Sequence, residues 1–235
     1  MISVCIATYN GSQYIRRQLE SIIAQLSGED EIIISDDGSS DTTLEIIREL
    51  SSPLIKIYQN QGEHGYTPNF ENALRHAKGH YIFLSDQDDV WREDRVSVCM
   101  QYLKKYDLVI SDASIIDGDE NELLDSFYSV RKPYKTFLGN ILKFGYLGCC
   151  MAFKRDVLIK SLPFPKNHVY CAHDNWITLI GMGYFKTKVI DEKLVHYRRH
   201  GANASAGFVN MHASTWFRIS YRMYLLWHVI MRVFR

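Results

Sequence analysis

Cysteine is scarce in this sequence of 235 residues, and its spacing excludes two common classes of protein. No CxxC motif occurs, and no set of cysteines and histidines has the spacing of a zinc site. An odd number of cysteines also does not fit a closed disulfide framework. Because two of them lie in apolar runs, where cysteine behaves as a small hydrophobic residue, we expect a reduced chain. The five cysteines are Cys5, Cys99, Cys149, Cys150 and Cys171.

Long apolar runs are missing as well. No stretch reaches the roughly 18 consecutive apolar residues that a membrane-spanning helix needs. The first ten residues, MISVCIATYN, have neither the charged start nor the long apolar segment of a secretory signal peptide, so we expect a cytoplasmic protein. The motifs GxGxxG and GxxxxGK(S/T) are also absent. Dinucleotide-binding and P-loop functions therefore lose their main support.

Acidic residues are absent from the C-terminal end. From residue 193 to residue 235 there are seven Lys and Arg but no Asp or Glu. The whole chain has 27 of each kind, so residues 1–192 carry 20 basic against 27 acidic residues, a net charge of −7. A basic end suggests an anionic partner such as a membrane surface, and an acidic body suggests metal sites. We do not expect nucleic-acid binding, because the body is acidic and carries no motif for it.

The residues that are present predict one α/β domain. Hydrophobic residues make up 46% of the chain, which is enough for a sizeable core. Apolar runs that predict strands alternate with segments of helical spacing, which is typical of a mostly parallel sheet with helices on both faces. We expect strands at 2–8, 31–37, 54–60, 80–86 and 107–113, and helices at 12–26, 39–50, 69–79 and 91–106.

The second half of the chain is less regular. Residues 148–158 predict a strand that runs into a helix, residues 173–183 a helix, and residues 184–201 two short strands and a loop. The last segment has apolar residues on one helical stripe and two arginines beside it. We therefore expect a domain at 1–210 and a C-terminal amphipathic, basic and aromatic helix at 211–235. The stripe consists of Trp216, Ile219, Met223, Leu226, Ile230 and Val233.

Three polar clusters follow predicted strands. They are Thr8-Tyr9-Asn10, Asp36-Asp37-Gly38, and the run from Asp86 to Asp89. In an open parallel sheet, ligands bind outside the carboxyl ends of the strands. We therefore expect the three clusters to meet at one edge and to form a binding site.

The run SDQDD places Asp86, Asp88 and Asp89 within four positions after an apolar strand. Clustered carboxylates stay ionised together when a divalent cation neutralises them, and Mg²⁺ or Mn²⁺ prefers oxygen ligands. Since Mg²⁺ takes few protein carboxylates and completes its shell with substrate phosphates, we expect a metal–diphosphate site. The alternative for Asp89 is that it caps the following helix. The run SDDGSSD at 35–41 could likewise be only a turn and a helix start.

Five motifs together resemble the family 2 glycosyltransferases: VCIATYNG, IIISDDGSSDTT, GHYIFLSDQDDVW, HDNW and YRRHGAN. They span residues 2–205 in the family's order, and the last two look most like bacterial rhamnosyltransferase-type members. The resemblance implies the GT-A (nucleotide-diphospho-sugar transferase) fold and inverting transfer from a nucleotide-sugar.

The resemblance also assigns roles to residues at the strand ends. Thr8, Tyr9 and Asn10 would line the nucleotide pocket, and Asp37 would receive the N3–H of the base. Asp86 would face the ribose or the metal. Asp88 would bind the metal that bridges the diphosphate, and His200 would approach it. Arg198 and Arg199 could bind phosphate.

Asp174 in HDNW matches the family's catalytic base, which takes the proton of the acceptor hydroxyl. Alternatively it is only an acid that the helix N-terminus favours. His173 could orient the acceptor or be packed. Trp176 would lie on the acceptor or donor-sugar side, and Gly148 would let substrate approach closely or be a plain turn glycine.

We therefore expect an inverting, Mg²⁺- or Mn²⁺-dependent glycosyltransferase in bacterial surface-polysaccharide synthesis. Its donor would be a UDP- or dTDP-sugar, and its acceptor a glycan or lipid-linked oligosaccharide. The C-terminal helix would contact the inner face of the plasma membrane; alternatively, it packs on the domain or docks on a partner. The alternatives are a nucleotidyltransferase that makes a nucleotide-sugar, and a non-catalytic assembly module with the same fold.

Overall fold

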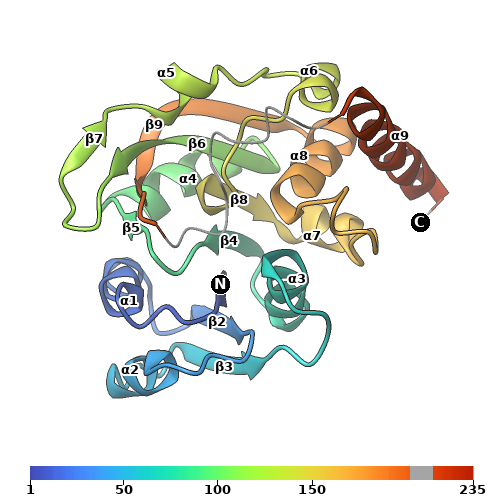
Figure 1. Cartoon of the computed structure of the whole chain (residues 1–235). Helices are drawn as coiled ribbons and strands as arrows, with labels where there is room; N and C mark the ends of the chain where they lie inside the picture. The colour runs from blue at the N-terminus through green and yellow to red at the C-terminus, as the bar shows by residue number, and fades with distance from the viewer. Residues whose placement is uncertain (202–213, 235) are drawn as a thin grey trace.

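A mixed sheet of nine strands runs through the protein, in a computed structural model that describes residues 1–201 and 214–234 (Figure 1). The strand order is β3-β2-β1-β4-β8-β6-β9-β5, and β7 pairs with β6 outside this path. The strands are β1 (Ile2–Thr8), β2 (Glu31–Asp36), β3 (Ile55–Gln59), β4 (Tyr81–Ser85), β5 (Val90–Trp91), β6 (Leu108–Ile116), β7 (Glu122–Leu124), β8 (Met151–Lys154) and β9 (Thr187–Arg198).

The first four strands of this order are parallel, as the sequence predicts. β8 runs antiparallel to both β4 and β6, and β9 is parallel to β6. The registers pair Thr8 with Asp36 and Ile6 with Ser85. The carboxyl ends of β1, β2 and β4 therefore meet at one edge of the sheet, so the three polar clusters lie together.

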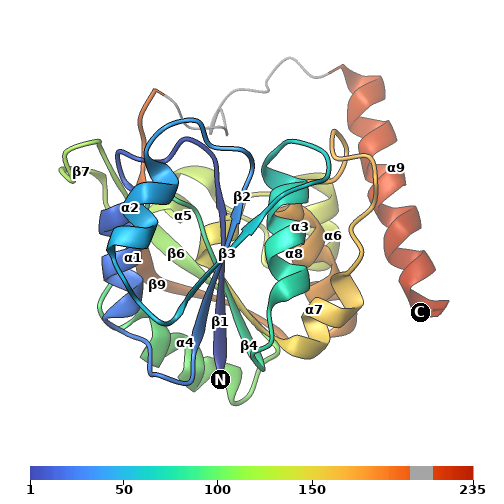
Figure 2. The same cartoon turned by 90° about the horizontal axis from the view of Figure 1, so that it is seen from below.

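Helices cover both faces of the sheet, and α9 lies outermost beside α6 and α8 (Figures 1 and 2). Helices α1, α2 and α4 pack on one face, and α3, α7 and α8 on the other. The helices are α1 (Ile15–Ile23), α2 (Thr43–Glu49), α3 (Tyr66–His76), α4 (Arg95–Leu103), α5 (Phe127–Arg131), α6 (Phe137–Leu142), α7 (Arg155–Ser161), α8 (His173–Tyr184) and α9 (Thr215–Met231), with short 3₁₀ turns η1 (Gly148–Cys150) and η2 (Arg232–Phe234).

Two hydrophobic cores follow from the alternation of side chains along each strand. In β1, Cys5 packs toward α3 and α8, while Val4 and Ile6 pack toward α1 and α2. Because both faces are covered, every residue of β2 is buried. The continuous apolar runs in the sequence are explained by this double burial.

The structure corrects two of the predicted elements. The helix expected from Trp91 begins at Arg95, because Val90 and Trp91 pair with β9 as the short strand β5. Residues 184–201 contain one long strand, β9 (Thr187–Arg198), instead of two short ones, and its pairing with β6 shifts register at Asp112. The expected domain boundary at residue 210 lies outside the described residues.

The C-terminal helix is present as α9, and it buries Leu225 and Val229 against the domain. Two arginines tie this end of the chain to the domain: Arg222 of α9 donates to the carbonyl of Ile141, and Arg232 of η2 to that of Leu162. Among the described residues, no helix is both long and apolar enough to cross a bilayer.

Candidate active site

The β1 and β4 ends are joined by the amide of Gln87, the residue between the aspartates. Its Oε1 accepts hydrogen bonds from Thr8 Oγ1 at 2.7 Å and from the Tyr9 N–H at 2.9 Å, and its Nε2 donates to the Tyr9 carbonyl. A Cβ on Gly11 would overlap this amide, so the loop requires glycine there. Tyr9 is 55% exposed, which leaves its ring open to a base.

The two aspartates after β2 have different tasks. Asp36 accepts from the N–H groups of Gly38 and Ser39, so it builds the turn. Asp37 faces the other way, and its two oxygens accept from Asn60 Nδ2 at 2.7 Å and the Gly65 N–H at 2.8 Å. Each carboxylate oxygen can accept a second bond, so Asp37 retains capacity for a base N–H.

Asn10 closes the turn after β1 onto the turn after β2. It has a positive φ of 48°, a left-handed conformation that Asn tolerates better than most residues. Its Oδ1 accepts from the Ser40 N–H at 2.8 Å, and its own N–H donates to Ser39 Oγ. In this structure Asn10 holds the two loops together.

The negative charge of the aspartate cluster after β4 is only partly offset by hydrogen-bond donors and positive groups. One oxygen each of Asp86 and Asp89 lies within 4.8 Å of the other and of Cys149 Sγ. Burial and the negative charges of Asp88 and Asp174 raise the pKa of Asp86 to about 7. Burial also raises the pKa of Asp89 well above its usual range, and its Oδ2 has no hydrogen-bond partner in the described part of the chain. A cation here would relieve both the repulsion and the unsatisfied oxygen, so the residues fit a divalent metal.

Residues from the end of β9 complete the cluster. His200 Nε2 lies 2.8 Å from Asp88 Oδ2, and the His200 ring packs beside Tyr14. Arg198 is almost fully buried, and its Nε donates to the Asp88 carbonyl at 2.8 Å. Its backbone N–H donates to Asp89 Oδ1 at 2.9 Å. Arg198 therefore fixes the backbone that carries the aspartates.

Asp174 lies in the first turn of α8, where its Oδ1 accepts from the Asn175 N–H at 2.7 Å. Burial raises the pKa of Asp174 to about 6, although this hydrogen bond and the charge of Arg131 act against the rise. Asp86 and Asp174 lie close enough for the charge of Asp174 to raise the pKa of Asp86. The base candidate and the aspartate cluster thus share one site.

His173 and Gly148 pack against each other beside Asp174. A Cβ on Gly148 would lie 2.5 Å from His173 Nε2 and 3.4 Å from Asp174 Cβ. The His173 ring stacks on Phe70 at 4.1 Å, and burial lowers its pKa to about 3, so it is neutral. The packed alternative for His173 therefore agrees with the structure, and the group that approaches Gly148 is the His173 ring.

Three sequence interpretations need correction. Trp176 is fully buried and donates from Nε1 to the Ser161 carbonyl at 2.8 Å, so it has no surface with which to contact a sugar. The guanidinium of Arg198 donates to protein oxygens, so its shown role is structural. Asp89 does not cap a helix, because α4 starts at Arg95 after β5 has intervened.

Sequence reasoning missed two residues of the site. Gln87 is the amide that binds the Thr8 loop, and its only signal was its position between two aspartates. Cys149 is one of the two cysteines that lie in apolar runs, yet its Sγ lies within 4.8 Å of carboxylate oxygens of Asp86 and Asp89. These neighbours follow β4, far away in sequence, so no local pattern could reveal the cluster.

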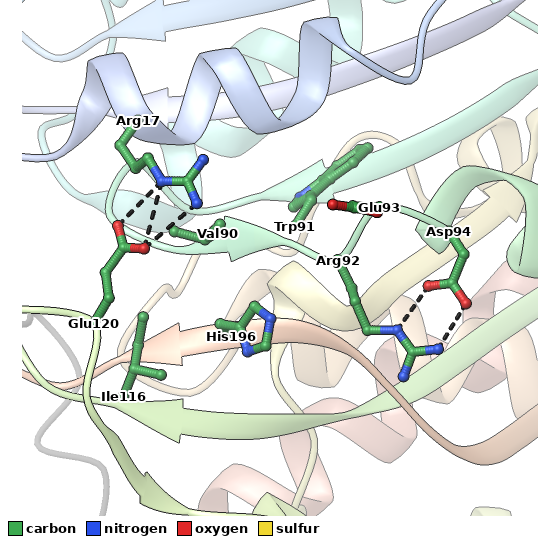
Figure 3. Close-up of a pocket in the computed structure, with 9 residues that line it drawn as sticks. All are labelled: Arg17, Val90, Trp91, Arg92, Glu93, Asp94, Ile116, Glu120 and His196. Atoms are coloured by element: carbon green, nitrogen blue, oxygen red, sulfur yellow. Dashed lines mark hydrogen bonds and ion pairs between the residues drawn. The ribbon is translucent and has the colours of Figure 1, made fainter.

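A cavity of about 540 Å³ lies apart from this cluster, between α1 and the paired strands β5 and β9 (Figure 3). Ion pairs join Arg17 to Glu120 and Arg92 to Asp94 in its wall. None of the sequence-predicted site residues lines it, so we do not assign the reaction to this cavity. The lining residues are Arg17, Val90, Trp91, Arg92, Glu93, Asp94, Ile116, Glu120 and His196.

The arrangement defines a class of protein. A sheet edge that brings together Asp37, the aspartate cluster and a carboxylate with raised pKa has the groups needed to bind a nucleoside diphosphate with a metal and to remove a proton nearby. Residues 3–162 match the model of glycosyl transferase family 2. The chain belongs to this family of glycosyltransferases.

Relatives in curated collections carry related names. The chain is 30% identical to the dTDP-rhamnosyl transferase RfbG of Shigella flexneri, over 85% of this chain and 75% of that protein. It is 24% identical to the UDP-Glc:alpha-D-GlcNAc-diphosphoundecaprenol beta-1,3-glucosyltransferase WfgD of Escherichia coli, over 80% and 76%. An uncharacterized glycosyltransferase of Nostoc sp. is 30% identical over 86% of this chain, which spans only 66% of that protein.

Solved structures show the same GT-A fold. TarS 1–349 of S. aureus in complex with UDP-GlcNAc has a TM-score of 0.69 at 18% identity, covering 96% of this chain and 71% of that one. A mannosyltransferase of Pyrobaculum calidifontis in complex with GDP-Man and Mn²⁺ has a TM-score of 0.61 at 22% identity, covering 82% and 54%. The expected fold is therefore confirmed.

Proposed function

We propose that the protein is an inverting glycosyltransferase that moves a sugar from a UDP- or dTDP-sugar to a glycan acceptor in surface-polysaccharide synthesis. The observation that carries this proposal is the convergence of Asp37, the aspartate cluster and Asp174 at one sheet edge. The names of the relatives, which include a UDP-glucose and a dTDP-rhamnose enzyme, support the two donor classes.

The donor nucleotide would bind at the ends of β1 and β2. Tyr9 offers an exposed ring beside the base, and Asp37 offers a carboxylate oxygen to its N3–H. Thr8 and Asn10 shape this pocket through their bonds to Gln87, Ser39 and Ser40. The nucleotide would thus be recognised largely by residues at the carboxyl ends of β1 and β2.

The diphosphate would lie over the aspartates. Asp86 and Asp88 would hold Mg²⁺ or Mn²⁺, with His200 beside Asp88. When bound, this metal offsets the negative charge that develops on the leaving diphosphate. Asp89 could add its Oδ2 as a further ligand, because Arg198 N–H occupies only Oδ1 and the oxygen of Asp89 lies within 4.8 Å of that of Asp86.

Asp174 would take the proton of the acceptor hydroxyl as that oxygen attacks the sugar. A pKa raised to about 6 suits this task, since the carboxylate is ionised at neutral pH and still basic enough to accept a proton. His173 would hold Asp174 in place by filling the space between Phe70 and Gly148.

We also propose that residues 1–210 form the catalytic domain and that the helix at 211–235 contacts the inner face of the membrane. The outward face of α9 is apolar, with Trp216 77% and Trp227 61% exposed. Exposed Leu138 and Leu142 lie on α6, which contacts α9. Such a surface suits a lipid-linked acceptor.

The test is a calorimetric screen of UDP- and dTDP-sugars with and without Mn²⁺, followed by transfer assays. We expect Asp88→Asn to lose metal-dependent donor binding, and Asp174→Asn to retain donor binding while losing turnover. Transfer by Asp174→Asn at the wild-type rate would show that the base assignment is wrong. Release of pyrophosphate from a nucleoside triphosphate and a sugar phosphate would favour a nucleotidyltransferase instead.

A further inference from the structure

The segment after β7 forms a short helix, α5, which packs on β6 and ends in Arg131. Asp112 of β6 anchors this helix by accepting from the Tyr128 N–H at 3.0 Å and from Ser126 Oγ at 2.5 Å. Tyr128 in turn donates from its hydroxyl to the Ser111 carbonyl at 2.7 Å. These bonds fix the position of Arg131, the last residue of α5.

The chain after α5 packs along the segment that leads to Gly148. Lys132 ends the helix with a left-handed φ of 45°. The Tyr134 carbonyl then accepts from the Tyr146 hydroxyl at 2.8 Å. Gly145 faces Pro133 so closely that an added Cβ would lie 3.2 Å from the proline side chain. Arg131 therefore lies beside the chain that approaches His173 and Asp174.

The guanidinium of Arg131 is not fully used within the protein. Its Nε is buried and has no hydrogen-bond acceptor among residues 1–201 and 214–234. Burying such a donor without an acceptor costs free energy, which a substrate oxygen would recover. The charge of Arg131 also acts on Asp174, whose pKa it lowers. The side chain thus lies near enough to Asp174 for its charge to act on the base candidate.

The charge of Arg131 itself favours an anion. Of the six Lys and Arg in residues 126–155, Lys135 pairs with Asp191 and Lys154 with Asp107, and Arg155 donates to the Ala77 and Gly79 carbonyls. Arginine also presents a planar fork of donors that matches phosphate oxygens.

We propose that Arg131 binds a phosphate group of the acceptor substrate, on the Asp174 side of the reaction centre. This inference rests on the proposed function. The donor's diphosphate has its own site at Asp86 and Asp88, whereas a group beside the proton acceptor belongs with the attacking sugar. In a sugar linked to lipid through diphosphate, one ring separates the attacking hydroxyl from the phosphate, so both would be reached together.

The experiment compares two synthetic acceptors with the same sugar, one an alkyl diphosphate and one a neutral alkyl glycoside. We expect Arg131→Gln to raise the KM of the diphosphate acceptor at least tenfold. The KM of the neutral acceptor and of the donor should change less than twofold. Lys132→Gln, at an exposed neighbouring position, is the matched control and should leave all three values unchanged. Arg131→Lys should rescue part of the effect, because it keeps the charge but loses the fork.

Calorimetric binding of the diphosphate acceptor to the donor-free protein gives the same comparison without turnover. The inference would be overturned if wild-type protein bound the two acceptors with equal affinity. It would also be overturned if Arg131→Gln reduced the affinity for both acceptors by the same factor. A rise in the donor KM would overturn it by assigning the arginine to the donor phosphates. A different result would contradict the proposed function itself: the absence of metal-dependent binding of any donor sugar.

Discussion

Replacing Asp86 with asparagine is expected to make the metal-free protein more stable. Burial, together with the negative charges of Asp88 and Asp174, raises the pKa of Asp86 from 3.8 to about 7. A carboxyl whose pKa is raised by folding destabilises the folded state as pH increases from the unfolded to the folded value. Above pH 7 the full loss of folding free energy caused by the ionised Asp86 is present, and Asp86→Asn removes this loss.

The magnitude follows from the shift. About three pKa units correspond to about 4 kcal/mol at ~1.4 kcal/mol per unit. Since the side chain of Asp86 keeps some contact with solvent, we expect roughly half, about 2 kcal/mol. In a protein of this size that is a rise in Tm of roughly 4–8 °C. At pH 5 only about a third of the effect should remain, because Asp86 is then protonated in the folded state.

The assay is thermal unfolding in EDTA at pH 8 and pH 5, with Asp156→Asn as a control at an exposed position on α7. Addition of Mn²⁺ should then raise the Tm of the wild type more than that of Asp86→Asn, because ligand binding stabilises the folded state. A lower Tm for Asp86→Asn than for the wild type in EDTA at pH 8 would refute the reasoning.

Three further predictions concern the chemistry of the site. The rate of sugar transfer should rise with pH around an apparent pKa of about 6 and then level off, since Asp174 must be ionised to accept a proton; a flat profile between pH 5 and 8 would exclude it as the base. Gly148→Ala should lower kcat roughly 100-fold with donor affinity unchanged, because the new Cβ would displace His173 and with it the base; normal turnover would contradict this packing. Arg198→Met should weaken Mn²⁺ binding at least tenfold, measured by calorimetry, whereas Arg155→Met, which removes hydrogen bonds to the Ala77 and Gly79 carbonyls, should affect only stability.

The first half of the fold was predictable from the sequence because its signals are local. The strand expected at 2–8 is β1 at the same bounds, and that expected at 31–37 differs by one residue. Double burial makes such strands continuous apolar runs, and turn residues mark their ends. The polar clusters could be placed at one edge because parallel strands share a direction.

The second half was less predictable because distant contacts decide it. Trp91 reads as the start of a helix, yet pairing with Val195 of β9 makes it a strand residue. The long β9 is shaped by shifts of register against β6, which no local pattern encodes. Two residues of the same motif, HDNW, also have different surroundings. Asp174 faces the site, whereas Trp176, two positions further along, is buried in the core.

The contact between His200 and Asp88 joins residues 112 positions apart in the sequence. During synthesis on the ribosome, the chain therefore carries β1, β2 and β4 long before it carries the residue that meets the aspartates. A nascent chain that ends before β9 also lacks Arg198, so the aspartate loop has no support from that strand. The aspartate cluster, for which we propose a metal and a diphosphate, is thus completed only late in synthesis.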